Sequence, residues 1–149
     1  MEIISNLLSR EKQNEIEKTL LDGDFPWYYT AEATYDQFKD HRTLNTPFFG
    51  HMFYAGDKIM SNHYYPIVIQ PILEALERYK GKRYQNRIWR IKGNLYTKDG
   101  SYPEDFHHPP HIDNGDENFR GETFLYFAND ADGDTFMFNE HYDYVHKRY

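Results

Sequence analysis

Cysteine is absent from the sequence. Its absence excludes disulfide bonds, zinc sites built on thiolates, and a cysteine nucleophile. Any metal ion must therefore be held by histidine and carboxylate side chains. The sequence also lacks a serine, histidine and aspartate nucleophile arrangement, a phosphate-binding glycine-rich loop and a dinucleotide fingerprint.

An excess of basic residues and a long apolar run are missing too. The formal net charge is -7 and no stripe of Lys and Arg offsets it locally, so the sequence predicts no nucleic-acid binding. The N-terminus lacks the basic region and the apolar length of a signal peptide, and no window is long enough for a membrane span. We therefore expect a soluble, cytoplasmic protein with no membrane partner.

The length of 149 residues suits one domain with its own core, rather than two. Aromatic residues make up 18% of the chain, which favours a sheet-rich core or an aromatic-lined cavity. We predict a single domain over residues 1–149, with a helical part over about 1–81 and a β part over about 86–149. The expected class is mainly β with supporting α-helices.

Two stretches have the periodicity of amphipathic helices. The first covers residues 9–21 and can be capped by Ser9. The second follows Pro66, ends at Gly81, and is bent or begins at Pro71. Its apolar face consists of Ile72, Leu76 and Tyr79.

Strand signals dominate the rest of the chain. Residues 25–30 are expected to form a short aromatic strand or extended segment, and residues 31–63 carry mixed signals that predict no regular structure. Residues 122–130 and 135–139 are expected to form a hairpin across an acidic turn, with "DADGD" serving the turn rather than a calcium loop. Antiparallel strands after helices indicate a sandwich or barrel.

Residues 86–97 alternate between two rows, as a strand does. One row is mostly apolar and contains Trp89, Ile91, Gly93 and Leu95. The other contains Ile88, Arg90, Lys92, Asn94 and Tyr96. The second row faces either water or the inside of a small barrel, where it would contact a ligand.

His111-Ile112-Asp113 is the strongest candidate for chemistry. In an extended segment, residues two apart project to the same face, so the imidazole and the carboxylate can reach one ion. This pair suits Fe(II), Mn(II) or Zn(II), and two prolines before His111 favour an extended approach. We therefore predict a metal site that includes His111 and Asp113.

The order of "RIKGNLY", "HHPPHIDN" and "TFLYFANDADGDTFMFN" resembles the 2-oxoglutarate- and Fe(II)-dependent oxygenases, particularly their prolyl-hydroxylase-like branch in bacteria and phages. The resemblance implies a double-stranded β-helix, a jelly-roll barrel with supporting helices. It implies that His111 and Asp113 bind Fe(II), and that Asn94 and Tyr96 belong to the pocket for the co-substrate 2-oxoglutarate. The activity it implies is hydroxylation of a C-H bond in a substrate that the sequence does not identify.

The chain also departs from the family pattern. The family's third ligand is a His several tens of residues after the His-x-Asp, followed by a basic residue that pairs with the co-substrate, whereas this chain stops at Tyr149. His141 and His146 lie too early, and His108 stands where a tyrosine is often found. We expect such an oxygenase or a fragment of one, with the last strands of the barrel missing and little or no turnover from this chain. Unpaired sheet edges would then favour a homodimer.

Two other functions stay open. The chain could be a non-catalytic jelly-roll binding module, or a zinc-binding protein that uses His107 or His108 with His111. Adjacent histidines on an extended chain face opposite ways, so at most one of the pair easily joins His111. The remaining histidines lack a spaced partner and are expected on the surface or in packing: His41, His51 and His63.

Overall fold

The computed structural model describes residues 2–31, 46–84, 87–97, 106–109, 111, 120–131, 133–138 and 144–146, with the backbone alone at 137–138 and 144–146. The chain divides into two compact units. The first unit comprises Met1–Tyr29 and Phe49–Tyr96, and the second comprises Thr30–Phe48 and Thr97–Tyr149.

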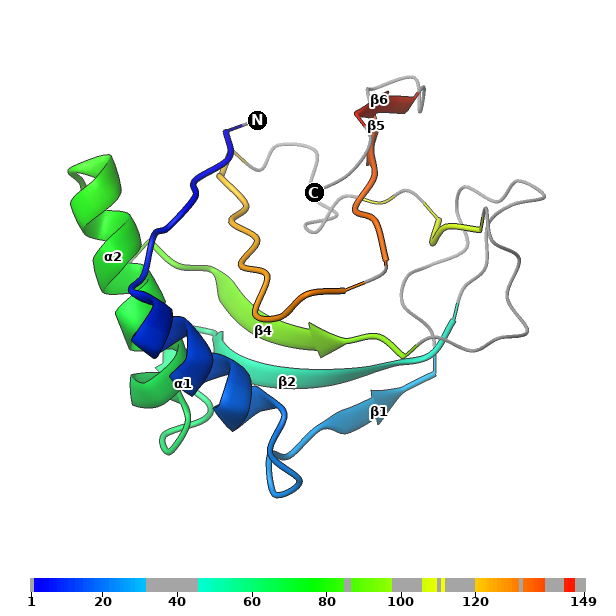
Figure 1. Cartoon of the computed structure of the whole chain (residues 1–149), viewed down its shortest axis with the longest axis horizontal. Coiled ribbons are helices and arrows are strands. Elements are labelled where there is room, and N and C mark those ends of the chain that lie inside the picture. The colour runs from blue at the N-terminus through cyan, green and yellow to red at the C-terminus, as the bar shows by residue number, and fades with distance from the viewer. Residues whose placement is uncertain are drawn as a thin grey trace. The chain divides into compact units, whose positions relative to one another are not determined.

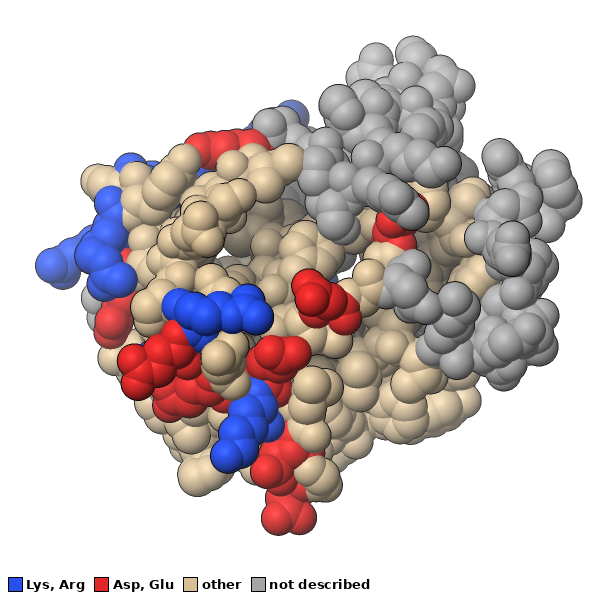
Figure 2. All heavy atoms as spheres, in the orientation of Figure 1, with Lys and Arg blue, Asp and Glu red and all other residues tan. Residues whose placement is uncertain are grey.

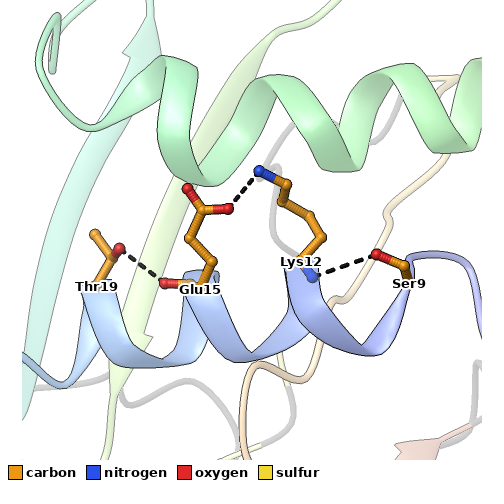
Figure 3. A network of polar contacts seen from close by, with 4 residues as sticks. All are labelled: Ser9, Lys12, Glu15 and Thr19. Atoms are coloured by element: carbon orange, nitrogen blue, oxygen red, sulfur yellow. Dashed lines mark hydrogen bonds and ion pairs between the residues drawn. The ribbon is translucent and has the colours of Figure 1, made fainter.

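Helix α1 (Arg10–Leu20) confirms the first predicted helix. Its N-terminus is capped as expected, because the Ser9 side chain accepts a hydrogen bond of 3.3 Å from the backbone N–H of Lys12 (Figure 3). Within the helix, Lys12 pairs with Glu15 and the Thr19 hydroxyl donates to the Glu15 carbonyl. Ile16 in the same helix is fully buried, which anchors the helix in the core.

The second helical stretch begins as a π-helix (η1, Tyr65–Ile69) and continues as α2 (Gln70–Lys80). Pro71 lies in the first turn of α2, directly after the π-helix, in agreement with the helix start or bend expected there. Gly81 ends the helix with φ 63°, the left-handed conformation that glycine adopts without strain. Val68 and Leu76 are buried, and α1 contacts the π-helix.

The N-terminal segment is tied to the end of α2 by three side chains. The carboxylate of Glu2 accepts a hydrogen bond of 2.9 Å from the Tyr79 hydroxyl and pairs with Lys80. The Lys80 and Tyr79 hydrogen bonds lower the pKa of Glu2, and the bond to Glu2 raises the pKa of Tyr79. Tyr79 is therefore bound to this segment, although its ring is 53% exposed.

An antiparallel sheet of four strands completes the first unit, and Figure 1 shows β2 between β1 and β4. The strands are β1 (Tyr28–Thr30), β2 (Phe48–Ala55), β3 (Lys58–Ile59) and β4 (Arg90–Leu95). Strands β2 and β3 form a hairpin whose two turn residues, Gly56 and Asp57, both have positive φ, as a type I′ turn requires. The regular structure of β2 and β3 was not predicted.

The register between β2 and β4 confirms the alternation predicted for residues 86–97 over the part that forms β4, Arg90–Leu95. Phe49 lies opposite Leu95 and His51 opposite Gly93, while Gly50 lies opposite Asn94. A Cβ on Gly93 would come within 3.3 Å of the rings of Phe53 and Trp27, so this row faces the core. Asn94 and Tyr96, on the other row, are exposed. A bulge between Met52 and Tyr54 shifts the register.

The hairpin predicted from residues 122–130 and 135–139 is wrong. None of the described residues 120–131 belongs to a strand, and β5 (Met137–Phe138) pairs with β6 (Tyr144–His146) instead. A strand forms only when its backbone hydrogen-bonds to a partner strand, and that partner depends on the tertiary fold. The β-prone sequence of residues 122–130 was therefore not enough to predict a strand there.

Over the described residues the fold is mixed α/β rather than mainly β, with two α-helices and a small antiparallel sheet of four strands. Supporting helices were expected, and so were antiparallel strands. A closed jelly-roll is not seen in the residues that the structure describes, where the four-stranded sheet is open. No described helix is both long and apolar enough to cross a membrane. Figure 2 shows Lys and Arg side chains beside Asp and Glu side chains around α1.

Candidate functional site

His111 belongs to the second unit and its side chain is exposed to solvent. Its Nδ1 lies 3.1 Å from the carbonyl oxygen of Pro109. A carbonyl oxygen only accepts hydrogen bonds, so Nδ1 must carry the proton, and the lone pair of the neutral ring is then on Nε2. Metal-binding histidines are typically held in this way, with one ring nitrogen donating to a carbonyl and the other facing the ion.

Pro109 gives this arrangement a fixed support, because its side chain is among the largest that are fully buried. The proline ring fixes φ of Pro109, and its burial anchors the residue whose carbonyl accepts the hydrogen bond from His111. The local sequence "HPPH" therefore orients His111 through its own backbone.

His107 and His108 are held by different contacts. The Nδ1 of His107 lies 2.9 Å from the carbonyl oxygen of His108, and its ring contacts Phe136 with 5.9 Å between the ring centroids. The Nε2 of His108 lies 3.4 Å from the Thr46 hydroxyl, which belongs to the same unit. Both residues are half-buried, in contrast to His111.

Only part of the metal site expected at His111 and Asp113 belongs to the residues that the structure describes. Asp113 lies outside the described residues, as do His141 and the side chain of His146. Among the side chains that the structure does describe, no three or more His, Asp or Glu gather into a group that could hold a metal ion. His111 is thus the one predicted ligand whose surroundings are described.

Asn94 and Tyr96, the predicted co-substrate residues, lie in the first unit at the C-terminal end of β4. Asn94 is exposed opposite Gly50, and Tyr96 is 47% exposed directly after the strand. Gly50 has no side chain, so nothing on that residue covers the amide of Asn94. Sequence reasoning missed this pairing, although the aromatic-rich run "FFGHMFYA" was a signal for β2.

His51 is a packing residue, as predicted. It is 6% exposed, its Nδ1 lies 2.9 Å from the carbonyl oxygen of Pro26, and its Nε2 lies 2.8 Å from the hydroxyl of Ser61. Nδ1 must donate to the carbonyl, so Nε2 accepts from Ser61 and both ring nitrogens are used. The rings of Phe25 and Phe53 pack against it at 4.6 Å.

The other two scattered histidines differ in what is described. His63 is exposed and contacts the ring of Tyr64, in agreement with the surface or packing position expected for it. His41 lies outside the described residues.

Comparison with known proteins adds nothing to the site, because no family model, curated protein or solved structure matches this chain.

Proposed function

We propose that this chain carries metal- and co-substrate-binding residues of a 2-oxoglutarate- and Fe(II)-dependent oxygenase of the jelly-roll type. His111 and Asp113 would bind Fe(II), and Asn94 and Tyr96 would contact 2-oxoglutarate. When bound, Fe(II) supplies the redox chemistry by which oxygen and 2-oxoglutarate hydroxylate a C-H bond. The order of the three sequence motifs supports this assignment.

The hydrogen bond between the His111 ring and Pro109 is the observation that carries the proposal. Nδ1 donates to the Pro109 carbonyl at 3.1 Å, which directs the lone pair to Nε2 of an exposed side chain. A histidine that only served packing would have a buried ring, as His51 has, whereas His111 is exposed. An exposed imidazole with its proton on Nδ1 supports the assignment of His111 as a metal ligand.

Two polar residues at the C-terminal end of β4 support the co-substrate part of the proposal. Asn94 and Tyr96 are exposed, and a carboxamide and a phenol can each donate a hydrogen bond to a carboxylate. Asn94 lies on the strand face opposite Gly93, away from the contact of Gly93 with Phe53 and Trp27, and Tyr96 directly follows the strand. These side chains can bind a ligand without opening the core.

The proposal is tested by titrating the chain with Mn(II), a redox-stable substitute for Fe(II), with and without 2-oxoglutarate. We expect 2-oxoglutarate to tighten Mn(II) binding, and Tyr96→Ala to reduce that effect by about tenfold, the usual cost of losing a supporting contact at a metal site. Tyr28→Ala is the matched control, because Tyr28 is 64% exposed at the other edge of the sheet. Tight Zn(II) binding with no influence of 2-oxoglutarate would instead support the zinc-binding alternative.

A further inference from the structure

A basic stretch of the first unit runs from the last turn of α2 into β4, over residues 78–92, and we call it the basic segment. It contains seven of the chain's 17 Lys and Arg residues and none of its 24 Asp and Glu residues. The net charge of -7 therefore hides a local excess of positive charge, contrary to the expectation drawn from the whole chain. Figure 2 shows Lys and Arg side chains grouped at the left edge of the view, where α2 lies in Figure 1.

Two hydrogen bonds of the Tyr84 backbone gather this segment. The N–H of Tyr84 donates to the carboxylate of Glu77 at 2.7 Å, which ties the loop after α2 back to the end of the helix. The carbonyl of Tyr84 accepts a hydrogen bond of 2.8 Å from the N–H of Arg87. Arg78 follows Glu77 and Arg83 precedes Tyr84, so these contacts bring the backbones of three arginines near one another.

The side chains of Arg78, Arg83 and Arg87 are all exposed. Within the described part of the chain, no hydrogen bond or ion pair engages their guanidinium groups. The carboxylate of Glu77, next to Arg78, accepts the N–H of Tyr84 instead. A guanidinium presents its donors in a planar fork that matches a phosphate group, so three such groups form a surface suited to a phosphate-rich ligand.

Aromatic rings are interleaved with these charges. Trp89 is 50% exposed, and the guanidinium of Arg90 lies 4.6 Å from its ring centroid. The ammonium of Lys82 lies 5.2 Å from the ring centroid of Tyr84. Proteins that bind single strands without sequence preference combine basic side chains for the phosphates with aromatic rings on which bases stack. The basic segment has both kinds of group.

We propose that the basic segment binds single-stranded nucleic acid. Its three exposed arginines contact phosphates, and the exposed part of the Trp89 indole stacks on a base. An acidic peptide would complement the arginines equally well, but it has no base to stack on Trp89. The inference concerns the first unit alone and does not depend on iron binding at His111.

The proposal is tested by the fluorescence anisotropy of labelled oligouridine and oligodeoxythymidine of about twelve nucleotides, titrated with the whole chain. We expect a Kd of about 1 to 100 µM at physiological salt, the range of sequence-independent binding. Three phosphate contacts on a single strand predict that log Kd rises with log salt concentration with a slope of about 2. Binding of either oligonucleotide supports the proposal, and comparing the two shows whether RNA or DNA is preferred.

Removing the arginines tests the phosphate contacts. Arg83→Gln should reduce the salt slope by about 0.7, because one phosphate contact is lost. The triple variant, with Arg78, Arg83 and Arg87 all replaced by Gln, should bind at least about tenfold more weakly. Arg10→Gln removes the same charge from an exposed arginine on α1, whose guanidinium donates to Gln13, and should leave the affinity and the slope unchanged.

Replacing Trp89 tests the stacking contact separately from charge. Trp89→Ala should weaken oligonucleotide binding about fivefold or more, whereas Trp89→Phe, which keeps an aromatic ring, should retain most of the affinity. An oligo-aspartate peptide of the same charge should bind more weakly than the oligonucleotides and should not respond to Trp89→Ala. Circular dichroism establishes that each variant is folded.

Three outcomes would overturn the proposal. The first is the absence of binding to both oligonucleotides at low salt, where electrostatic attraction is strongest. The second is equal affinity of the folded triple variant and Arg10→Gln. The third is binding of oligo-aspartate as tight as that of the oligonucleotides, with no effect of Trp89→Ala on either, which would indicate an acidic protein partner instead.

Discussion

Gly93 on β4 lies directly opposite His51 on β2, and both occupy the face of the sheet that packs into the core. The space beside Gly93 is filled by the rings of Phe53 and Trp27, each 3.3 Å from the position that a Cβ would take. The glycine thus lets two aromatic rings approach the strand while His51 is buried next to them.

Replacing Gly93 with Ala should destabilise the first unit. The added methyl group must displace two packed aromatic rings, and overpacking of this kind costs about 1 to 3 kcal/mol. Urea unfolding followed by tryptophan fluorescence measures it, because both tryptophans, Trp27 and Trp89, belong to the first unit. Gly23→Ala is the control, since a Cβ there meets no atom within 4 Å. Equal midpoints for the two variants would contradict the packing account.

Removing the Ser61 hydroxyl should also destabilise this unit. Nε2 of the buried His51 accepts the Ser61 hydrogen bond at 2.8 Å, and Ser61→Ala would leave that nitrogen buried without its donor. An unsatisfied buried polar atom costs about 1 to 3 kcal/mol. Ser5→Ala, at an exposed position, should change the unfolding free energy little. If Ser61→Ala were as stable as Ser5→Ala, the hydrogen bond would have no net effect.

The contact of Glu2 with α2 should depend on pH. The bonds from Lys80 and Tyr79 lower the pKa of Glu2 below 4.5, so its contribution is complete above pH 4.5 and is lost as the pH falls through the lowered value. Tyr79 behaves in the opposite sense: its pKa is raised above 10.0, so its contribution is present below pH 10.0 and is lost as the pH rises beyond it.

An NMR titration of the Glu2 carboxyl carbon checks this prediction. The original chain should give a midpoint below 4.5, and Lys80→Met should move the midpoint upward, because the lysine bond is the largest cause of the shift. A midpoint that does not respond to Lys80→Met would show that the N-terminal segment does not make this contact in solution.

Local signals in the sequence predicted the parts of the fold whose causes are local. Ser9 and Gly81 marked the ends of helices correctly, because capping depends on a few neighbouring residues. Alternation predicted β4 and the core-facing side of Gly93. His51 was expected on the surface or in packing, and its burial shows that it is a packing residue.

Strand partners were not predictable in the same way. β2 contains Gly50, which weakens a strand signal, yet its pairing with β4 over most of its length makes it the longest strand. Residues 122–130 have strong β propensity, but none of the described ones joins a ladder, and β5 pairs with β6. For the candidate site, the sequence identified His111 by its spacing to Asp113, whereas the direction of its ring lone pair required the contact with Pro109.

The most direct test of the iron proposal is the equilibrium affinity for Fe(II), measured without oxygen, for the original chain and for His111→Ala. We predict that His111→Ala weakens Fe(II) binding at least about tenfold, while His63→Ala, which removes another exposed histidine, has no effect. Circular dichroism should be unchanged in both variants, because neither ring is buried. Equal Fe(II) affinities for all three proteins would contradict the assignment of His111 as a metal ligand.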